Sequence, residues 1–239
     1  MLGLLENIEE YNNAGALLGI DGNFDEELLG ALKRVNPVQR QKLVNKITST
    51  GARSRGSRAE MEKHFGELPT HIKSGLSKGE LRLADSVIYS IKPVSSKTIK
   101  LFETQDDKEV GLRNISNAKL PKNQSLLVSG IWLLVGKAET NGKDKIIATK
   151  FGKIEDYPAI ANGEFSLKCN KKQIVPETPN VIFKTDQLHK VPVGYYKLAN
   201  PRLIHDDMLI EMVIELGTME GIQENTFIYA GLHGTITTP

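Results

Sequence analysis

The chain has 239 residues, which is enough for one domain of medium size with an appendage or for two small domains. Hydrophobic residues make up 39% and charged residues 25%, the composition of an ordinary foldable protein, and the formal net charge of +2 excludes a polycation. The single cysteine, Cys169, excludes an internal disulfide framework and is predicted to be a small buried side chain, as fits folding in a reducing compartment.

The sequence also limits where the chain is expected to act. No stretch approaches the ~20 consecutive apolar residues of a membrane-spanning helix. Residues 1–6 lack the basic region and the long apolar run of a signal peptide. We therefore expect no transmembrane segment and no export by the usual route.

Charge is segregated at the N-terminal end of the chain. Residues 1–30 contain seven carboxylates and no lysine or arginine. Residues 33–58 contain eight basic residues and no carboxylate, namely Lys33, Arg34, Arg40, Lys42, Lys46, Arg53, Arg55 and Arg58. Beyond this basic segment the charges are mixed.

The first 80 or so residues have the spacing of short helices. Apolar residues recur every three or four positions at Phe24, Leu28, Leu32 and Val35, and acidic residues precede them, where the helix dipole favours negative charge. A second helix is predicted from Asn36-Pro37, because Asn caps a helix well and Pro is tolerated in the first turn.

Two further short helices are predicted after a break that is rich in Ser, Thr, Gly and Arg. Ser57 and Glu60 have the spacing of a capping box, in which each side chain satisfies a backbone donor of the other residue. Ile72 and Leu76 lie one turn apart in the last helix, which is predicted to end near Gly79.

From about residue 85 the apolar period changes from 3.6 to 2, which predicts β-strands. Residues 207–217 and 226–237 alternate between apolar and polar side chains, as in half-buried strands. Residues 124–135 are apolar on both faces and are predicted to form a central strand, although periodicity alone also allows a helix. Turn residues separate six further predicted strands, at 86–94, 97–103, 146–151, 164–169, 172–176 and 180–185.

About eight or nine strands therefore follow one another without a helical pattern between them, which argues against a parallel doubly wound sheet. We predict a mainly β fold: a single jelly-roll β-sandwich of eight or so antiparallel strands in residues 84–239. An α-helical N-terminal arm, residues 1–83, would precede it and would contain the basic segment 33–58.

No set of residues has a spacing that is typical of catalysis. Ser129 lacks the glycine two positions before it that a nucleophile elbow needs. His205-Asp206-Asp207 is the best metal-like group, but it is predicted to be a polar loop before the next strand. Glu211 and Glu215 share a strand face about 13 Å apart, too far to share a proton. We therefore predict no enzymatic activity, no cofactor and no metal.

The basic segment has two interpretations. Arg53, Arg55 and Arg58 lie in a Ser/Gly stretch in which guanidinium groups can adapt to phosphates without a fixed site. The eight basic residues are thus candidate contacts with nucleic acid. Alternatively, they pair with the acidic residues 1–30 of the same or a neighbouring subunit. Aromatic side chains are absent from the segment, which argues against specific single-strand recognition.

Four motifs in the first half of the β region follow a familiar order. The first is a strand that ends in Leu101-Phe102, and the second is a turn over Gly111-Leu112-Arg113-Asn114-Ile115. A bend at Leu120-Pro121 follows, and then an apolar strand over residues 126–131 that ends in Gly-Ile. This order resembles that of jelly-roll major capsid proteins of tailless icosahedral bacteriophages. Residues 231–239 are similar to the last strand of such coats.

The resemblance covers about residues 85–135 and 205–239. It implies a structural coat protein that self-assembles in many copies into an icosahedral shell around the phage genome, with no catalytic residues to carry over. Such a protein is made and folded in the host cytoplasm and resides in the virion, where other virion proteins are further partners. Many such coats stack two jelly rolls, whereas this chain has room for one, and its helical arm of about 80 residues is unusual.

Two other classes of protein are alternatives to a coat protein. A non-enzymatic binding module, such as a virion spike, a minor capsid protein or a carbohydrate-binding protein, usually exposes aromatic side chains. Trp132 lies in the run predicted to be buried, and Tyr195-Tyr196 is the one aromatic pair predicted to be exposed. An enzyme on a cupin-like jelly roll needs histidines that converge inside the barrel, and His189, His205 and His233 are widely separated in the sequence.

Overall fold

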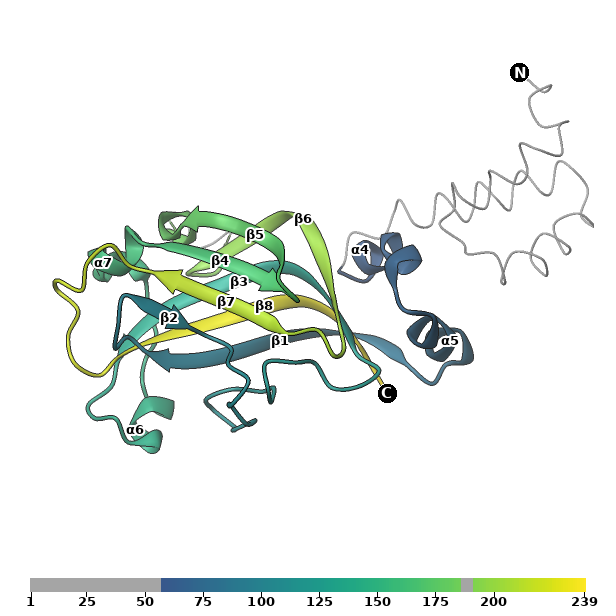
Figure 1. Cartoon of the computed structure of the whole chain (residues 1–239), viewed down its shortest axis with the longest axis horizontal. Helices are drawn as coiled ribbons and strands as arrows, with labels where there is room; N and C mark the ends of the chain where they lie inside the picture. Colours follow the sequence, from purple (N-terminus) through teal and green to yellow (C-terminus); the bar gives the residue numbers. More distant parts are fainter. Residues whose placement is uncertain (1–56, 186–190) are drawn as a thin grey trace, which may run out of the picture. The chain divides into compact units, whose positions relative to one another are not determined.

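The structure is a computed structural model that describes residues 57–185 and 191–239 (Figure 1). The chain divides into two compact units, residues 1–74 and 75–239. The helices predicted between residues 24 and 47 lie outside the described residues. The division at residue 83, expected from the change of period, stays a prediction.

Short helices precede the first strand, as predicted. Helix α4 covers Ser57–Lys63, the 3₁₀-helix η1 covers Phe65–Glu67 and helix α5 covers Thr70–Lys78. Helix α5 ends at Gly79, whose φ of 75° lies in the left-handed region that glycine adopts without steric cost. The amide of Glu80 then donates to the carbonyl of Gly75 at 2.9 Å and closes the helix end.

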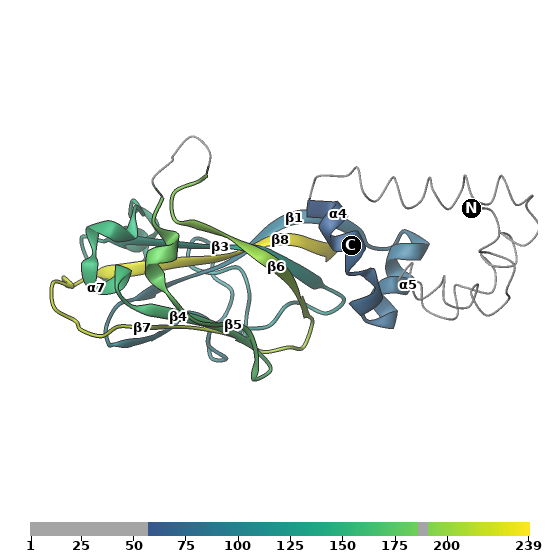
Figure 2. The same ribbon diagram turned by 90° about the horizontal axis from the view of Figure 1, so that it is seen from above.

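Eight strands form the rest of the fold. Their bounds are β1 Arg82–Pro93, β2 Thr98–Lys100, β3 Ser125–Lys137, β4 Glu164–Cys169, β5 Lys172–Pro179, β6 Tyr195–His205, β7 Ile210–Glu215 and β8 Thr226–Thr238. They make two antiparallel four-stranded sheets, in the orders β1-β8-β3-β6 and β2-β7-β4-β5. Figure 2 shows the sheets as two layers. The prediction of a mainly β sandwich is confirmed.

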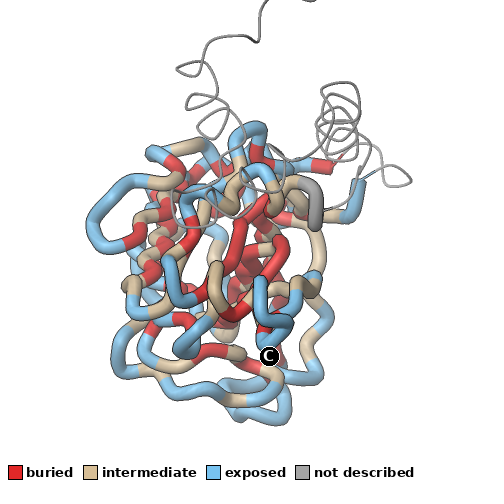
Figure 3. Tube along the Cα trace, turned by 90° about the vertical axis from the view of Figure 1, so that its right-hand side faces the viewer, coloured by how far each residue is buried: buried red, intermediate tan, exposed pale blue. Residues whose placement is uncertain are grey.

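One apolar core lies between the layers. Inward positions alternate with outward ones, most clearly in β7, where Ile210, Met212 and Ile214 are buried and the residues after each of them are half-buried or exposed. These side chains join one buried cluster with Ile131 of β3 and Phe165 of β4, which belong to different sheets. In Figure 3 the buried positions run through the middle of the sandwich. Burial of this shared core is the main force that holds the two sheets together.

Two of the predicted strands are wrong. Residues 143–147 form the short helix α6, Lys143–Ile147, in which Ile146 is buried and Ile147 is exposed. Residues 180–183 form the 3₁₀-helix η3, Asn180–Phe183. In both places a short apolar run contributes one or two buried side chains that hold a connection in place, and it does not form the inward face of a strand. A short apolar run in the sequence does not distinguish a buried strand from a short helical turn.

Strand β6 was not predicted. Its middle, Ala199-Asn200-Pro201, breaks the apolar alternation, and its register with β3 shifts between Val128 and Gly130. A proline is tolerated here because β6 lies at the edge of its sheet, where one side needs no backbone partner. The connection between β3 and β4 also contains the 3₁₀-helix η2, Ile154–Asp156, and helix α7, Pro158–Ala161.

The close approach of β3 and β8 requires glycine at position 234. A Cβ atom there would overlap the carbonyl oxygen of Leu127 on β3. We expect Gly234→Ala to lower the free energy of unfolding by about 3 kcal/mol, because the backbone must shift to admit the methyl group. Chemical denaturation measures the loss.

Gly217→Ala is the matched control, since nothing lies within 4 Å of the added Cβ atom. Its cost should stay below about 1 kcal/mol. Equal costs for the two variants would show that the close contact at Gly234 does not constrain the sheet.

Candidate functional site

The predicted electrostatic site on the arm lies almost entirely outside the described residues. Seven of its eight basic residues precede residue 57, and Arg58 lies in helix α4. The contacts assigned to the basic segment therefore stay a prediction.

The metal-like group His205-Asp206-Asp207 is a structural turn. Nδ1 of His205 lies 3.0 Å from the hydroxyl oxygen of Ser125, and the amide of Asn123 donates to Asp206 at 2.8 Å. Both contacts tie the end of β6 to the start of β3. Among residues 57–185 and 191–239, no group of three or more His, Cys, Asp or Glu side chains is placed to hold a metal ion.

The nucleophilic side chains are equally unsuited to catalysis. Ser129 is buried at the register shift in β3, and Cys169 is buried in the core at the end of β4. Burial raises the pKa of the Cys169 thiol to about 11, and the nearby carboxylate of Glu211 adds to the rise. A thiol with that pKa stays neutral at physiological pH and is a poor nucleophile.

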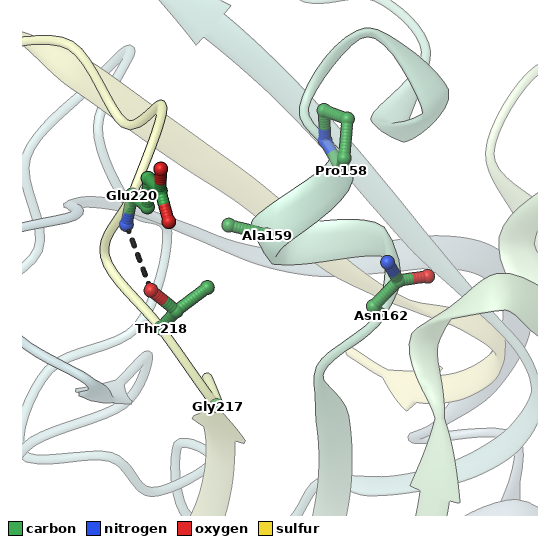
Figure 4. A pocket seen from close by; sticks show the side chains of 6 residues that line it. All are labelled: Pro158, Ala159, Asn162, Gly217, Thr218 and Glu220. Atoms are coloured by element: carbon green, nitrogen blue, oxygen red, sulfur yellow. Dashed lines mark hydrogen bonds between the residues drawn. The ribbon is translucent and has the colours of Figure 1, made fainter.

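The best-defined hollow in the described residues is small and open. It has a volume of about 230 Å³ and lies between helix α7 and the connection from β7 to β8 (Figure 4). Its lining residues are Pro158, Ala159, Asn162, Gly217, Thr218 and Glu220. The amide of Glu220 donates to the hydroxyl of Thr218 at 3.1 Å. Ligand pockets usually enclose about 300–1,000 Å³, so this hollow is a poor candidate for a small-molecule site.

Aromatic rings gather on the outer face of the β1-β8-β3-β6 sheet. Trp132, predicted to be buried, is half-buried there, with its ring centroid 5.0 Å from that of Tyr195 and 5.2 Å from that of His233. The hydroxyl of Tyr195 lies 3.1 Å from Nδ1 of His233. Gly130 makes room for this group, since a Cβ atom there would overlap the Tyr195 hydroxyl. Tyr195 and Tyr196, predicted to be exposed, are half-buried at the start of β6.

Large apolar side chains are exposed at two places in the connections between strands. Val110 and Ile147 are 85% and 48% exposed, and we call them the Val110 patch. Val181, Ile182 and Val191 are 53%, 36% and 40% exposed, and we call them the Val181 patch. Sequence analysis missed both patches, because Val110 is an isolated apolar residue in a polar loop and the others lie in runs predicted to be strand or turn.

The two patches lie at opposite edges of the sandwich. The loop that carries Val110 runs along the free edge of β1, where the amide of Ile91 donates to the carbonyl of Leu112 at 2.8 Å. Val181 and Ile182 follow β5, the last strand of one sheet, and Val191 precedes β6, the last strand of the other. The patches therefore lie at the β1/β2 edge and the β5/β6 edge.

Both edges are poorly suited to pairing with another strand. Pro176 and Pro179 interrupt β5, and Pro201 interrupts β6. At the other edge, the side-chain amide of Asn114 donates to the carbonyl of Val87 at 2.7 Å and covers part of β1. Edges blocked in this way limit the addition of a further strand to either sheet.

A charged network fixes the loop that carries the Val110 patch. Nζ of Lys92 on β1 lies 2.5 Å from Glu103 and 2.7 Å from Asp106, and Arg113 lies 2.7 Å from the other oxygen of Asp106. The four side chains are 13–27% exposed, so solvent screens these pairs less than it screens pairs on the open surface. The loop is therefore held firmly against β1.

No protein-family model matches the chain, and no curated protein is significantly similar to it. None of the helices in the described ranges has the length and apolar character needed to cross a membrane.

The Asp106 carboxylate should be central to the charged network. We expect Asp106→Asn to lower the free energy of unfolding by about 2–3 kcal/mol, because Arg113 loses its carboxylate in a partly buried place. Denaturant titration measures the loss, and hydrogen exchange should show faster opening of residues 103–113.

Glu109→Gln is the control for this prediction. Glu109 pairs with Lys143 at 2.6 Å, but the Lys143 side chain is 69% exposed, so removing the charge should cost less than about 1 kcal/mol. A cost for Asp106→Asn no larger than that of Glu109→Gln would contradict the proposed role of the network.

The raised pKa of Cys169 predicts a loss of stability at high pH. The folded state favours the neutral thiol, so this contribution is complete below pH 9, the ordinary pKa of the group, and is lost as pH rises toward about 11. We expect unfolding free energies of the wild type and of Cys169→Ala, measured from pH 8 to pH 11, to converge by about 2 kcal/mol. A constant difference between the two proteins would contradict the prediction.

Proposed function

We propose that the sandwich is a jelly roll and that the protein is a coat subunit, which self-assembles into an icosahedral capsid around a phage genome. The observation that carries the proposal is the pairing of the strands. β1 pairs with β8, β2 with β7, β3 with β6 and β4 with β5. This is the pattern of a two-stranded antiparallel ribbon that is wrapped so that successive pairs fall in alternate sheets, as a jelly roll requires.

Jelly rolls also occur in lectins and cupins, so the fold alone does not decide the function. A cupin-like enzyme needs metal ligands inside the barrel. His205 is engaged at a turn, His233 lies on an outer face, and His189 lies outside the described residues. The apolar core and the lack of a large hollow in the described part favour a structural role.

The exposed apolar patches support a role in assembly. Large exposed apolar side chains are costly to leave in water, and contiguous ones mark contacts with other molecules. Closed assemblies of many identical copies use such patches repeatedly. The virion is the proposed location, with folding in the host cytoplasm and other virion proteins as further partners.

The basic segment 33–58 keeps two proposed roles in such a shell. It either contacts the genome without sequence preference or pairs with the acidic residues 1–30 of a neighbouring subunit. The first role predicts strong salt dependence of nucleic-acid binding, and the second predicts salt-dependent assembly without nucleic acid.

A second candidate function is a binding module, either a virion spike or minor capsid protein or a carbohydrate-binding protein. The half-buried group of Trp132, Tyr195 and His233 on an outer sheet face favours it, because aromatic rings can stack on sugar rings. Such a module would be a monomer or small oligomer that binds glycans, and changing Trp132 would abolish the binding.

The coat proposal is tested by assembly of the purified full-length chain. We expect closed particles by electron microscopy and a mass of many subunits by light scattering. Deletion of residues 1–60 should leave a folded β domain, with a cooperative unfolding transition, that forms no closed particles. The ratio of absorbance at 260 nm to that at 280 nm reports nucleic acid in the particles.

Each outcome separates the alternatives. A full-length chain that remains a monomer at high concentration would contradict the coat function and favour the binding module. Closed particles formed by the truncated chain would show that the arm has no role in assembly.

A further inference from the structure

Two Asn-Gly sequences occur in the chain, at Asn141-Gly142 and Asn162-Gly163. In such a pair the backbone nitrogen of the glycine can attack the side-chain amide carbon of the asparagine, because glycine has no Cβ atom to crowd the approach. Both asparagines are exposed to solvent. Exposure and sequence therefore do not distinguish the two sites, but the geometry of the backbone does.

The backbone around Asn141 is open. Residues 139–142 are all exposed and lie outside the helices and strands, in the connection between β3 and α6. Within the described part of the chain, Asn141 forms no hydrogen bond through its backbone or its side chain. The torsion between its Cα and its carbonyl carbon can therefore rotate without breaking a contact.

The nitrogen that would attack at this site is weakly engaged. Among the described residues, the amide of Gly142 donates to the hydroxyl of Thr140 alone, at 3.3 Å, which is longer than the usual distance of about 2.9–3.0 Å. An added Cβ atom at Gly142 would meet nothing closer than this hydroxyl, at 3.4 Å. The nitrogen therefore reaches the side-chain carbon of Asn141 at little cost.

The second pair is held by its neighbours. Asn162 follows helix α7 (Figure 4), and its amide donates to the carbonyl of Pro158 at 2.9 Å. The amide of Gly163, which would have to attack, donates to the carbonyl of Ile160 at 3.1 Å. Gly163 is buried, and a Cβ atom there would lie 2.6 Å from the carbonyl oxygen of Glu215. Rotation about Asn162 would break these contacts.

We propose that Asn141 is a site of spontaneous deamidation in the folded protein and that the fold protects Asn162. The nitrogen of Gly142 bonds to Cγ of Asn141 and loses its proton, while the side-chain nitrogen takes up a proton and leaves as ammonia, so that a cyclic succinimide forms. Water then opens the ring at either of its two carbonyl carbons and yields aspartate or isoaspartate. The inference goes beyond the proposed coat function and does not rest on it.

The folded chain should tolerate the product. Position 141 is exposed, so the new carboxylate is solvated and displaces no buried group. Two nearby lysines, Lys143 and Lys145, already pair with Glu109 and Glu139, at 2.6 Å and 2.5 Å. These pairs are on the open surface and contribute little to stability, so a further charge beside them changes little. We therefore expect the modified protein to accumulate in the native state with an unchanged unfolding midpoint.

Peptide mass spectrometry of the full-length chain tests the inference. The protein is incubated in mildly alkaline buffer, once folded and once in denaturant, and is then digested with trypsin, which cleaves after lysine and arginine. Asn141 lies in the resulting peptide 138–143 and Asn162 in the peptide 154–168, so each site is measured separately. Fragmentation of the peptides distinguishes isoaspartate from aspartate.

In the folded chain, Asn141 should deamidate at least ~10-fold faster than Asn162, which corresponds to a difference in opening cost of about 1.4 kcal/mol. In denaturant the two rates should agree within about 3-fold, because the unfolded chain holds neither loop in its native geometry. The increase at Asn162 on unfolding measures its protection, so Asn162 is the internal control.

The variant Gly142→Val tests the route of the reaction. Gly142 has a φ of −67° and a ψ of 137°, which residues with a side chain adopt without strain, and the space around it is open, so the variant should fold. The branched side chain crowds the attacking nitrogen. Deamidation of Asn141 should therefore slow at least ~10-fold, while that of Asn162 should not change.

Three results would overturn the inference. Equal rates at the two sites in the folded chain would show that the fold does not protect Asn162. A rate at Asn141 that is at least ~10-fold lower in the folded chain than in denaturant would show that its loop is closed, whatever the state of assembly. An unchanged rate at Asn141 in Gly142→Val would exclude the succinimide route.

Discussion

The architecture depends on strand β8 being held between two partners. It pairs antiparallel with β1 along one side and with β3 along the other, over nearly its whole length. β1 begins the sandwich and β8 ends it, so the central pairing joins residues about 150 positions apart, and a long loop must close before it forms. Gly234 and the register shift at Gly130 allow the two backbones to approach. The sandwich therefore forms as one cooperative unit.

The same pairing gives the two outer faces different chemistry. On the β1-β8-β3-β6 sheet the outward positions hold rings, such as Tyr89 and Tyr229, which stack with centroids 5.6 Å apart. On the β2-β7-β4-β5 sheet they hold charges, and Glu164 lies directly opposite Glu215. Two carboxylates in that position repel each other across the strands. An exposed face tolerates this repulsion because water screens the two charges. Neither face repeats the other, so the subunit has two distinct sides.

Much of the fold could be predicted because the inward side chains of each long strand repeat with period 2. The strands at 207–217 and 226–237 were predicted from this alternation, whereas the central strand near Trp132 was predicted from its apolar run on both faces. Alternation did not predict β6, where an edge position admits Pro201, and the apolar run at α6 was wrongly predicted to be a strand, although only Ile146 is buried there. Nothing in the sequence indicated the exposed patches, because residue type alone does not distinguish an exposed valine from a buried one.

The features that limit strand pairing at the sheet edges also narrow the ways in which copies could join in the proposed assembly. Prolines in β5 and β6 and the covering of β1 by the following loop disfavour a continuous sheet between subunits. In the proposed assembly, contacts would then fall to side chains on the connections, and a charged network holds the connection over residues 103–113 against β1. In the proposed shell, contacts through the connections would leave both sheet faces uncovered, one on each side of the shell. Because the two faces differ in chemistry, a single fold would give the proposed shell an inner and an outer surface of different character.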